Sequence, residues 1–229
     1  NDVTGVRAYS NGDPISSTIN NSERKTTGYN FNNNVLYRHA FAKKGRPISF
    51  NLGTAINEKQ GDVYRLNNNL YNKIPNDFVD SSNQFTNVVN NGYQLSANIA
   101  YTEPIGKKGQ LQFNYSPSYS KSQSDQEVNQ YDYTSSKYIL FDTALSNKFD
   151  NVVIKQNIGT NYRVGNKDNM FTVGVSYQRT DLKSDQTFPL ITSVDKSFDN
   201  ILPNLMWNKK FDAKNRIRIM FRSNTNTPS

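Results

Sequence analysis

The side chains that could carry out covalent chemistry are few in this 229-residue chain. It contains one histidine, His39, and no cysteine, so thiolate catalysis, thiolate metal sites and disulfide bonds are excluded. Serines are abundant, but a catalytic triad needs a histidine held between the nucleophile and a carboxylate. His39 stands between Arg38 and Ala40, on the apolar face of its segment. We therefore predict that the chain is not an enzyme, needs no cofactor, and places His39 at an interface.

Acidic side chains gather in two parts of the chain, at Asp77 and Asp80 and again at Asp125, Glu127 and Asp132. Oxygen-rich loops of this kind can hold Ca²⁺. Their spacing does not match an EF-hand loop, and we interpret them, together with Asp181 and Asp185, as solvated loop charges. The sequence therefore predicts no metal site.

Five arginines fall on the polar phase of strand-like alternation: Arg38, Arg163, Arg216, Arg218 and Arg222. A guanidinium recognises carboxylates and phosphates through a fork of N–H donors. These side chains could attract an anionic substrate or hold another part of the protein in place. They could also pair with acidic neighbours on the same wall, which is the interpretation that the sequence slightly favours.

The overall composition limits the partners and the class of the chain. The net charge is +8, but the basic residues are scattered or lie in tight turns. Because they do not alternate with aromatic residues as in a strand-binding groove, we predict no nucleic-acid partner. Hydrophobic residues make up only 34%, yet 14 tyrosines and 13 phenylalanines argue against disorder.

The elements that position these residues are predicted to be strands. Apolar and polar residues alternate with a period of two in eight segments, whereas helical spacing is nowhere sustained. The segment 201–211 is the weakest, because apolar residues fall on both of its faces. The predicted strands are 29–41, 48–57, 93–102, 111–119, 152–163, 171–178, 201–211 and 216–222.

The predicted connections alternate between short and long. Short basic or Gly/Asn-rich turns are expected at 43–46, 106–109, 165–169 and 212–215, and long loops near 61–90, 124–150 and 184–199. Residues 1–27 are expected to form a leading loop or a partial strand. Pro117 and Pro203 lie about eight or nine residues from a short turn, which predicts a position near the far rim, where pairing can loosen.

These features predict an all-β fold, an antiparallel up-and-down meander of the transmembrane β-barrel type. Residues 1–229 would form a single barrel segment of about eight strands, part of a larger barrel, with short turns at one rim and long loops at the other. The apolar face would meet outer-membrane lipid and the face of Asn, Gln, Ser and Thr would meet a water-filled lumen. The aromatic residues expected at the lipid interface are Tyr37, Phe41, Tyr101, Tyr115, Tyr119, Tyr162, Tyr177, Trp207 and Phe211.

An antiparallel sheet that is half buried in a soluble protein alternates in the same way. The alternative is therefore a soluble or surface-exposed β-sheet binding module, glycan-binding or adhesin-like, which would stay monomeric and folded without detergent. Loops of about 15–30 residues are unusual in a compact soluble domain and favour the barrel.

The tail of the chain carries a family resemblance. The segment "LPNLMW" at Leu202–Trp207, the strand "KNRIRIMFR" at Lys214–Arg222, the closing "SNTNTPS" and the strand "NMFTVGVSYQRTDL" at Asn169–Leu182 resemble outer-membrane β-barrel proteins of Bacteroidetes related to TonB-dependent receptors. The resemblance covers most of the chain, most clearly from about Asn151 onward, and its motifs are strand and turn signatures.

The resemblance implies a location in the bacterial outer membrane and a receptor or transporter that binds a nutrient at its extracellular loops and passes it through the lumen. It also implies the TonB system and a surface lipoprotein as partners of the intact protein. Relatives carry a carboxypeptidase-like domain and a plug before the barrel, and we find neither here. We expect an interior part of a barrel that closes into a small eight-strand barrel or associates edge to edge when isolated.

Overall fold

The computed structural model describes residues 2–8, 14–72 and 78–225. No helix occurs in this part of the chain, and hence none that is long and apolar enough to cross a membrane. The ten strands are β1 (Asp2–Ala8), β2 (Pro14–Ala40), β3 (Pro47–Tyr71), β4 (Phe78–Ile105), β5 (Gly109–Asp132), β6 (Lys137–Phe141), β7 (Asn147–Gly165), β8 (Asn169–Phe188), β9 (Thr192–Lys210) and β10 (Arg216–Arg222).

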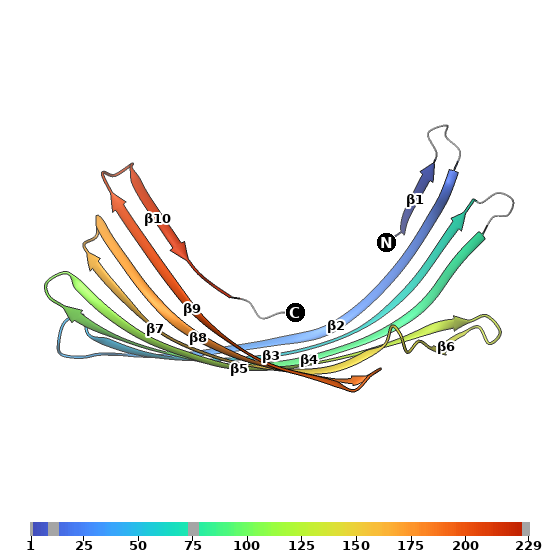
Figure 1. The fold of residues 1–229 in the computed structure, drawn as a ribbon, viewed down its shortest axis with the longest axis horizontal. Coiled ribbons are helices and arrows are strands. Elements are labelled where there is room, and N and C mark those ends of the chain that lie inside the picture. Colours follow the sequence, from blue (N-terminus) through green and yellow to red (C-terminus); the bar gives the residue numbers. More distant parts are fainter. Residues whose placement is uncertain (1, 9–13, 73–77, 226–229) are drawn as a thin grey trace.

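All ten strands belong to one antiparallel sheet in the order β1-β2-β3-β4-β5-β7-β8-β9-β10, with β6 paired to β5 beside this path. Figure 1 shows this up-and-down meander, in which each strand follows its chain neighbour across the sheet. The predicted all-β antiparallel meander is confirmed. The predicted count of eight strands is wrong by two, because β1 and the short hairpin strand β6 show too little alternation to be recognised.

The strands are much longer than predicted, and the expected long loops are mostly strand. β2, β3, β4 and β5 contain 27, 25, 28 and 24 residues. The ranges 61–90, 124–150 and 184–199 are therefore largely strand. Residues 1–27 were expected to form a leading loop or a partial strand, and residues 2–8 and 14–27 lie in β1 and β2. Both faces are polar in much of these ranges. The strands therefore pair through their backbones without the alternation of apolar and polar residues by which a strand is predicted from sequence.

The prolines lie inside strands and not at their far ends. Pro117 is the ninth residue of the 24-residue β5, and it pairs with Gln156 of β7. On its β4 side the pairing stops at Ser96–Ser118 and resumes at Ile99–Tyr115. Because proline has no N–H group to donate, the ladder loosens at Pro117, but the site is mid-strand. Pro203 also lies inside β9, where it pairs with Val175, and the predicted position of both prolines near the far rim is wrong.

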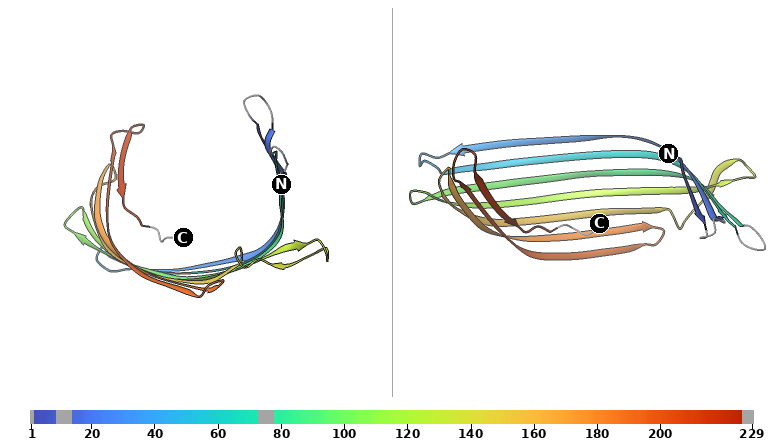
Figure 2. Two further views of the ribbon diagram at one scale, coloured as in Figure 1. Left: turned by 45° about the vertical axis from the view of Figure 1, so that its right-hand side comes forward. Right: turned by 90° about the horizontal axis from the view of Figure 1, so that it is seen from above.

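The sheet is an open trough with two free edges. β1 and β10 lie at opposite edges and are not paired with each other in the described part of the chain (Figures 1 and 2). The segment after β10 turns into the trough, where the Ser223 N–H donates to the Pro203 carbonyl at 3.2 Å and Gln178 Nε2 donates to Thr225 Oγ1 at 3.0 Å. The face that carries Gln178 is therefore the concave one.

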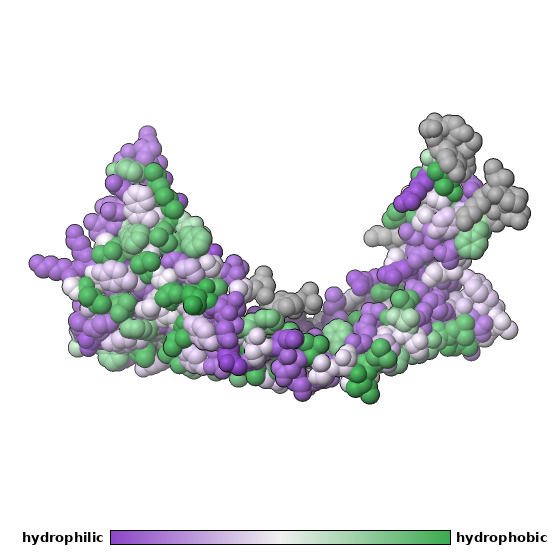
Figure 3. Space-filling model, in the orientation of Figure 1, coloured by the Kyte–Doolittle hydropathy of each residue, from purple (hydrophilic) through white to green (hydrophobic). Residues whose placement is uncertain are grey.

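The opposite, convex face carries the apolar side chains. One continuous row of paired residues runs across seven strands: Tyr37, Phe50, Ile99, Tyr115, Ile158, Tyr177 and Ile201. Each of them is 38–73% exposed. Figure 3 shows apolar side chains exposed among polar ones on the visible surface.

The described part of the chain has almost no core. Val63 and Val128 are its only buried hydrophobic residues, and the accessible surface is 16228 Å². A compact protein of this mass would expose about 10,500 Å². The apolar rows are therefore not packed against a second sheet or a helix of the described chain.

The apolar convex surface forms a band beside the short turns. We call it the apolar band and define it by five nine-residue segments, 29–37, 48–56, 93–101, 111–119 and 154–162, whose convex positions contain no charged residue. Charged residues follow two positions beyond three of these segments, at Glu58, Glu103 and Lys121. A tilted strand crosses a bilayer in about 9–11 residues, which matches this width.

The stagger of the strands gives the tilt that a barrel needs. Tyr37 lies three residues before the end of β2, and Ile201, in the same row, lies nine residues before the end of β9. Along this row of paired residues, the distance to the rim of short turns therefore increases by six residues over six neighbouring strand pairs. With about 3.3 Å per residue and 4.8 Å between strands, this corresponds to a tilt of about 35°, which is typical of closed β-barrels.

Candidate functional site: an arginine-lined groove on the concave face

The concave face of the sheet is lined by Asn, Gln, Ser, Thr and Gly. Glycines on this face leave room for the polar side chains of the neighbouring strands. Asn161 pairs with Gly174, and a Cβ atom at Gly174 would meet the Asn161 amide oxygen and would lie 2.7 Å from the Thr160 carbonyl oxygen. The polar side chains can therefore lie flat on the strands and leave the trough open.

A groove of about 570 Å³ lies on this face, over β4, β5, β7, β8, β9 and β10. We call it the arginine groove. Its arginines are Arg163, Arg218 and Arg222, and its other polar lining includes Thr102, Gln110, Gln112, Asn161, Thr172 and Asn208. Met220 lies on β10 between Arg218 and Arg222 and shares its row with Met206, Thr172 and Arg163.

The structure places all five predicted arginines on the concave face, and it brings three of them together. Arg38 pairs with Ser49 at the other side of the trough, and Arg216 stands beside the turn after β9. Neither lines the arginine groove. None of the five forms an ion pair within the described residues, where the ion pairs are Lys43–Glu103, Arg46–Glu103, Lys148–Asp125, Arg179–Asp181 and Lys183–Asp185. The interpretation that they neutralise acids on the same wall is therefore wrong for this part of the chain.

The predicted interface aromatics lie on the convex side of the sheet or in its short turns. Tyr37, Tyr101, Tyr115, Tyr119, Tyr162, Tyr177 and Trp207 share the convex face. Phe41 and Phe211 follow β2 and β9, with the Phe41 ring 6.4 Å from Tyr101 and the Lys209 ammonium 4.9 Å from the Phe211 ring. His39 stacks edge-on against Phe41 at 4.8 Å, at the end of the apolar band. Contact of these rings with lipid stays a prediction.

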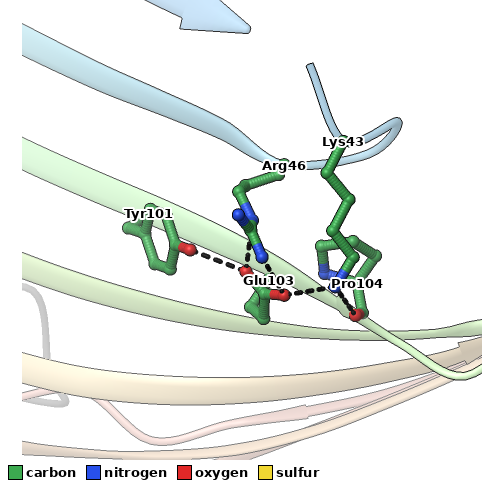
Figure 4. Close-up of polar contacts among 5 residues, drawn as sticks. All are labelled: Lys43, Arg46, Tyr101, Glu103 and Pro104. Carbon is green, nitrogen blue, oxygen red and sulfur yellow. Dashed lines mark hydrogen bonds and ion pairs between the residues drawn. The ribbon is translucent and has the colours of Figure 1, made fainter. Parts of the chain in front are cut away.

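A cluster of charged residues at the rim of short turns was not foreseen from the sequence (Figure 4). Arg46 donates to both oxygens of Glu103, from Nε at 2.7 Å and from Nη2 at 2.8 Å. Lys43 and the Tyr101 hydroxyl each donate to the same carboxylate at 2.6 Å. The turn between β2 and β3 is thereby tied to β4, and because four donors already surround Glu103, this cluster is structural. A basic turn followed by a Tyr-x-Glu near the end of β4, the second strand after that turn, is the signal that could have revealed it.

The acidic residues do not assemble a metal site. No group of three or more His, Asp or Glu side chains in the described residues is placed to hold a metal ion. Asp125 pairs with Lys148 at 2.5 Å, and Asp132 accepts hydrogen bonds from the N–H groups of Thr134 and Ser135. The hydrogen bond from the Ser135 side chain, followed by those from the N–H groups of Thr134 and Ser135, lowers the pKa of Asp132. Asp77 lies outside the described residues.

Comparison with known proteins gives one match. Residues 39–229 match the model of the outer membrane protein beta-barrel family. The search of curated proteins and the search of solved structures find no match. The match covers most of the chain and includes β3 to β10, the strands that carry the arginine groove and most of the apolar band. The chain therefore belongs to the outer membrane protein beta-barrel family, and its location is the outer membrane.

Proposed function

We infer that the chain forms part of the wall of an outer-membrane receptor or transporter related to the TonB-dependent receptors. In this proposal a hydrophilic nutrient binds at the extracellular side and passes along the concave face. The TonB system and a surface lipoprotein would be the partners of the intact protein. The mechanism is binding and gated passage, with no bond made or broken.

The observation that carries the proposal is the contrast between the two faces of the band. The convex face is apolar over a width that matches a membrane crossing, while the concave face is polar along the same strands. Unpaired guanidinium groups on the concave face would be costly in hydrocarbon and are stable in water. A wall of this kind supports a water-filled path.

The alternative of a soluble binding module is set aside by the family and by the bare convex face. A surface-exposed glycan-binding module would rest on the aromatic residues beyond the band. Tyr64, Phe85 and Tyr138 instead pack on one another, with ring centroids 4.9–6.0 Å apart. They hold the β6 hairpin against β3 and β4, and we do not favour a binding role for them.

Uptake measurements in cells test the proposal. Because the chain has no native cysteine, Asn161→Cys on the concave face can be labelled alone with a bulky, membrane-impermeant thiol reagent. We expect deletion of the gene to abolish energy-dependent uptake of one nutrient, and labelled Asn161→Cys to block the uptake that the unlabelled variant restores. Ile139→Cys, in the exposed β6 hairpin, is the control and should stay active after labelling. Uptake unchanged by gene deletion, over a panel of nutrients, would contradict a transport role.

A further inference from the structure

The arginine groove concentrates positive charge at one side of the trough. Arg163, Arg218 and Arg222 line it, and no acidic residue does. None of the three has an ion-pair or hydrogen-bond partner among the described residues. A concave surface with charges of one sign raises the local concentration of the opposite ion.

The spacing of the three arginines indicates the size of the ligand. Arg218 and Arg222 lie four residues apart on β10, which corresponds to about 13 Å. Arg163 lies on β7, three strands from β10 and in the row of Met220, so that its backbone is about 14 Å away. This triangle suits a ligand with more than one anionic group better than a single small anion.

Neutral groups between the arginines can complete the coordination of such a ligand. The amides of Gln110, Gln112 and Asn161 face the groove. Thr172 and Asn208 also line it.

We propose that the arginine groove is a binding site for a solute with two or more carboxylate or phosphate groups. The guanidinium groups contact the anionic groups, and the amides of Gln110, Gln112 and Asn161 contact the rest of the ligand. This rests on the proposed passage along the concave face and adds a class of substrate to it. An acidic segment of the same protein lodged in the trough is the competing occupant.

Titration calorimetry of the detergent-solubilised chain at low salt tests the proposal. The probes are citrate for carboxylates, inorganic pyrophosphate for phosphates, and raffinose as a neutral solute of larger size. We expect one or both anions to bind and raffinose not to bind. Binding of citrate alone assigns the site to carboxylates, and binding of pyrophosphate alone to phosphates.

The variants Arg163→Gln and Arg218→Gln/Arg222→Gln test whether anions bind to the groove itself or are attracted by the overall positive charge of the chain. A charge-assisted hydrogen bond typically contributes enough that each lost guanidinium weakens anion binding by about tenfold. Arg38→Gln is the matched control, because it removes the same charge from the concave face outside the groove, and it should change binding less than about twofold. Arg218→Lys keeps the charge but loses the forked geometry, so intermediate binding is expected.

Three results would overturn the proposal. They are binding of raffinose with equal affinity, an equal loss in Arg38→Gln and in the groove variants, and no anion binding in a chain shown by circular dichroism to be folded. Anion binding that appears only after removal of an acidic segment from the intact protein would assign the groove to that segment and also overturn it. Calorimetry measures binding and does not depend on uptake. Anion binding to the solubilised chain, together with cellular uptake that deletion of the gene leaves unchanged, would support the site and contradict transport.

Discussion

The apolar band and the parts of β2–β5 beyond it belong to the same four strands but are built differently. We call these parts the polar extensions and define them as residues 14–28, 57–71, 78–92 and 120–132. Convex positions of the band carry no charge, whereas those of the polar extensions include Glu23, Lys25, Asp62, Asp125 and Glu127. The backbone ladder runs through both without interruption in β2, β3 and β4.

The difference shows that pairing and side-chain environment are separate demands. Hydrogen bonds between neighbouring strands hold the sheet together in both regions. Hydrocarbon around the band requires apolar side chains on the convex face, and water around the polar extensions does not. The strands can therefore continue beyond the membrane with a composition that is usually found in loops.

The largest expected effect is that of a lysine on the convex face of the band. Ile158 in the band and Ile139 in the β6 hairpin are exposed to almost the same extent, 58% and 55%. In lipid vesicles we expect Ile158→Lys to lower the free energy of unfolding by about 2–4 kcal/mol, because the ammonium group enters hydrocarbon. Ile139→Lys should change it by less than about 0.5 kcal/mol. Urea titrations of both variants measure the difference, and equal effects would remove the distinction between the band and the β6 hairpin, which pairs with the polar extension of β5.

A smaller loss is expected on the concave face of β8. Gly174→Ala places a methyl group against Asn161 and the Thr160 carbonyl, and should destabilise the protein by about 1–3 kcal/mol. Gly5→Ala in β1, where no atom lies within 4 Å of the added methyl group, is the control. It should be neutral or slightly stabilising. If Gly174→Ala is also neutral, the close approach of the strands on this face is not needed for stability.

In the β6 hairpin, which pairs with the polar extension of β5, we expect a local effect from Tyr138→Ala. Tyr138 contacts the rings of Tyr64 and Tyr131 at 5.6 and 5.0 Å and donates to Asn83 Oδ1 at 2.9 Å. Loss of these contacts should lower the free energy of local opening by about 1–2 kcal/mol in the β6 hairpin and leave the band unchanged. Hydrogen exchange measures both regions at once. Tyr133→Ala, which removes a ring that is 70% exposed, should have little effect.

The smallest effect concerns pH and the connection after β6. Gln130 and the N–H groups of Leu145 and Ala144 donate to Asp142, and these hydrogen bonds lower its pKa. A lowered pKa in the folded state stabilises the connection above the ordinary pKa of aspartate, about 3.9, and the contribution is lost as the pH falls through the folded value. We expect proteolysis of residues 142–146 to increase below about pH 4. In Asp142→Asn the same cleavage should be fast and independent of pH. If residues 142–146 of this variant stay protected from proteolysis with the pH profile of the unmodified chain, Asp142 does not stabilise the connection.

The band could be predicted from the sequence because one face of each strand meets an apolar environment. Period-two alternation then fixes the phase, and it placed Tyr37, Ile158 and Arg218 on their observed faces. The polar extensions could not be predicted in this way, because both of their faces meet water and residues such as those at 14–28 carry no period. Alternation is a signal of environment, and pairing alone does not produce it.

The arginine groove was predictable only in part. The polar phase of Arg163, Arg218 and Arg222 follows from their strands. That these three meet in one groove while Arg38 lies elsewhere depends on the register of β7 to β10, which is set by long-range pairing. Thr172 and Asn208 carry no sequence signal, because Thr and Asn fill much of the concave face.

Fluorescence quenching by lipid tests the central claim that the convex face meets hydrocarbon. The chain has no native cysteine, so Ile158→Cys and its neighbour Asn157→Cys can each carry one fluorophore on opposite faces of β7. In vesicles of tail-brominated lipid we expect strong quenching of the label at 158 and weak quenching at 157, with the reverse order for a water-soluble quencher. Equal quenching at the two positions, or stronger lipid quenching at 157, would contradict the orientation of the sheet on which the account rests.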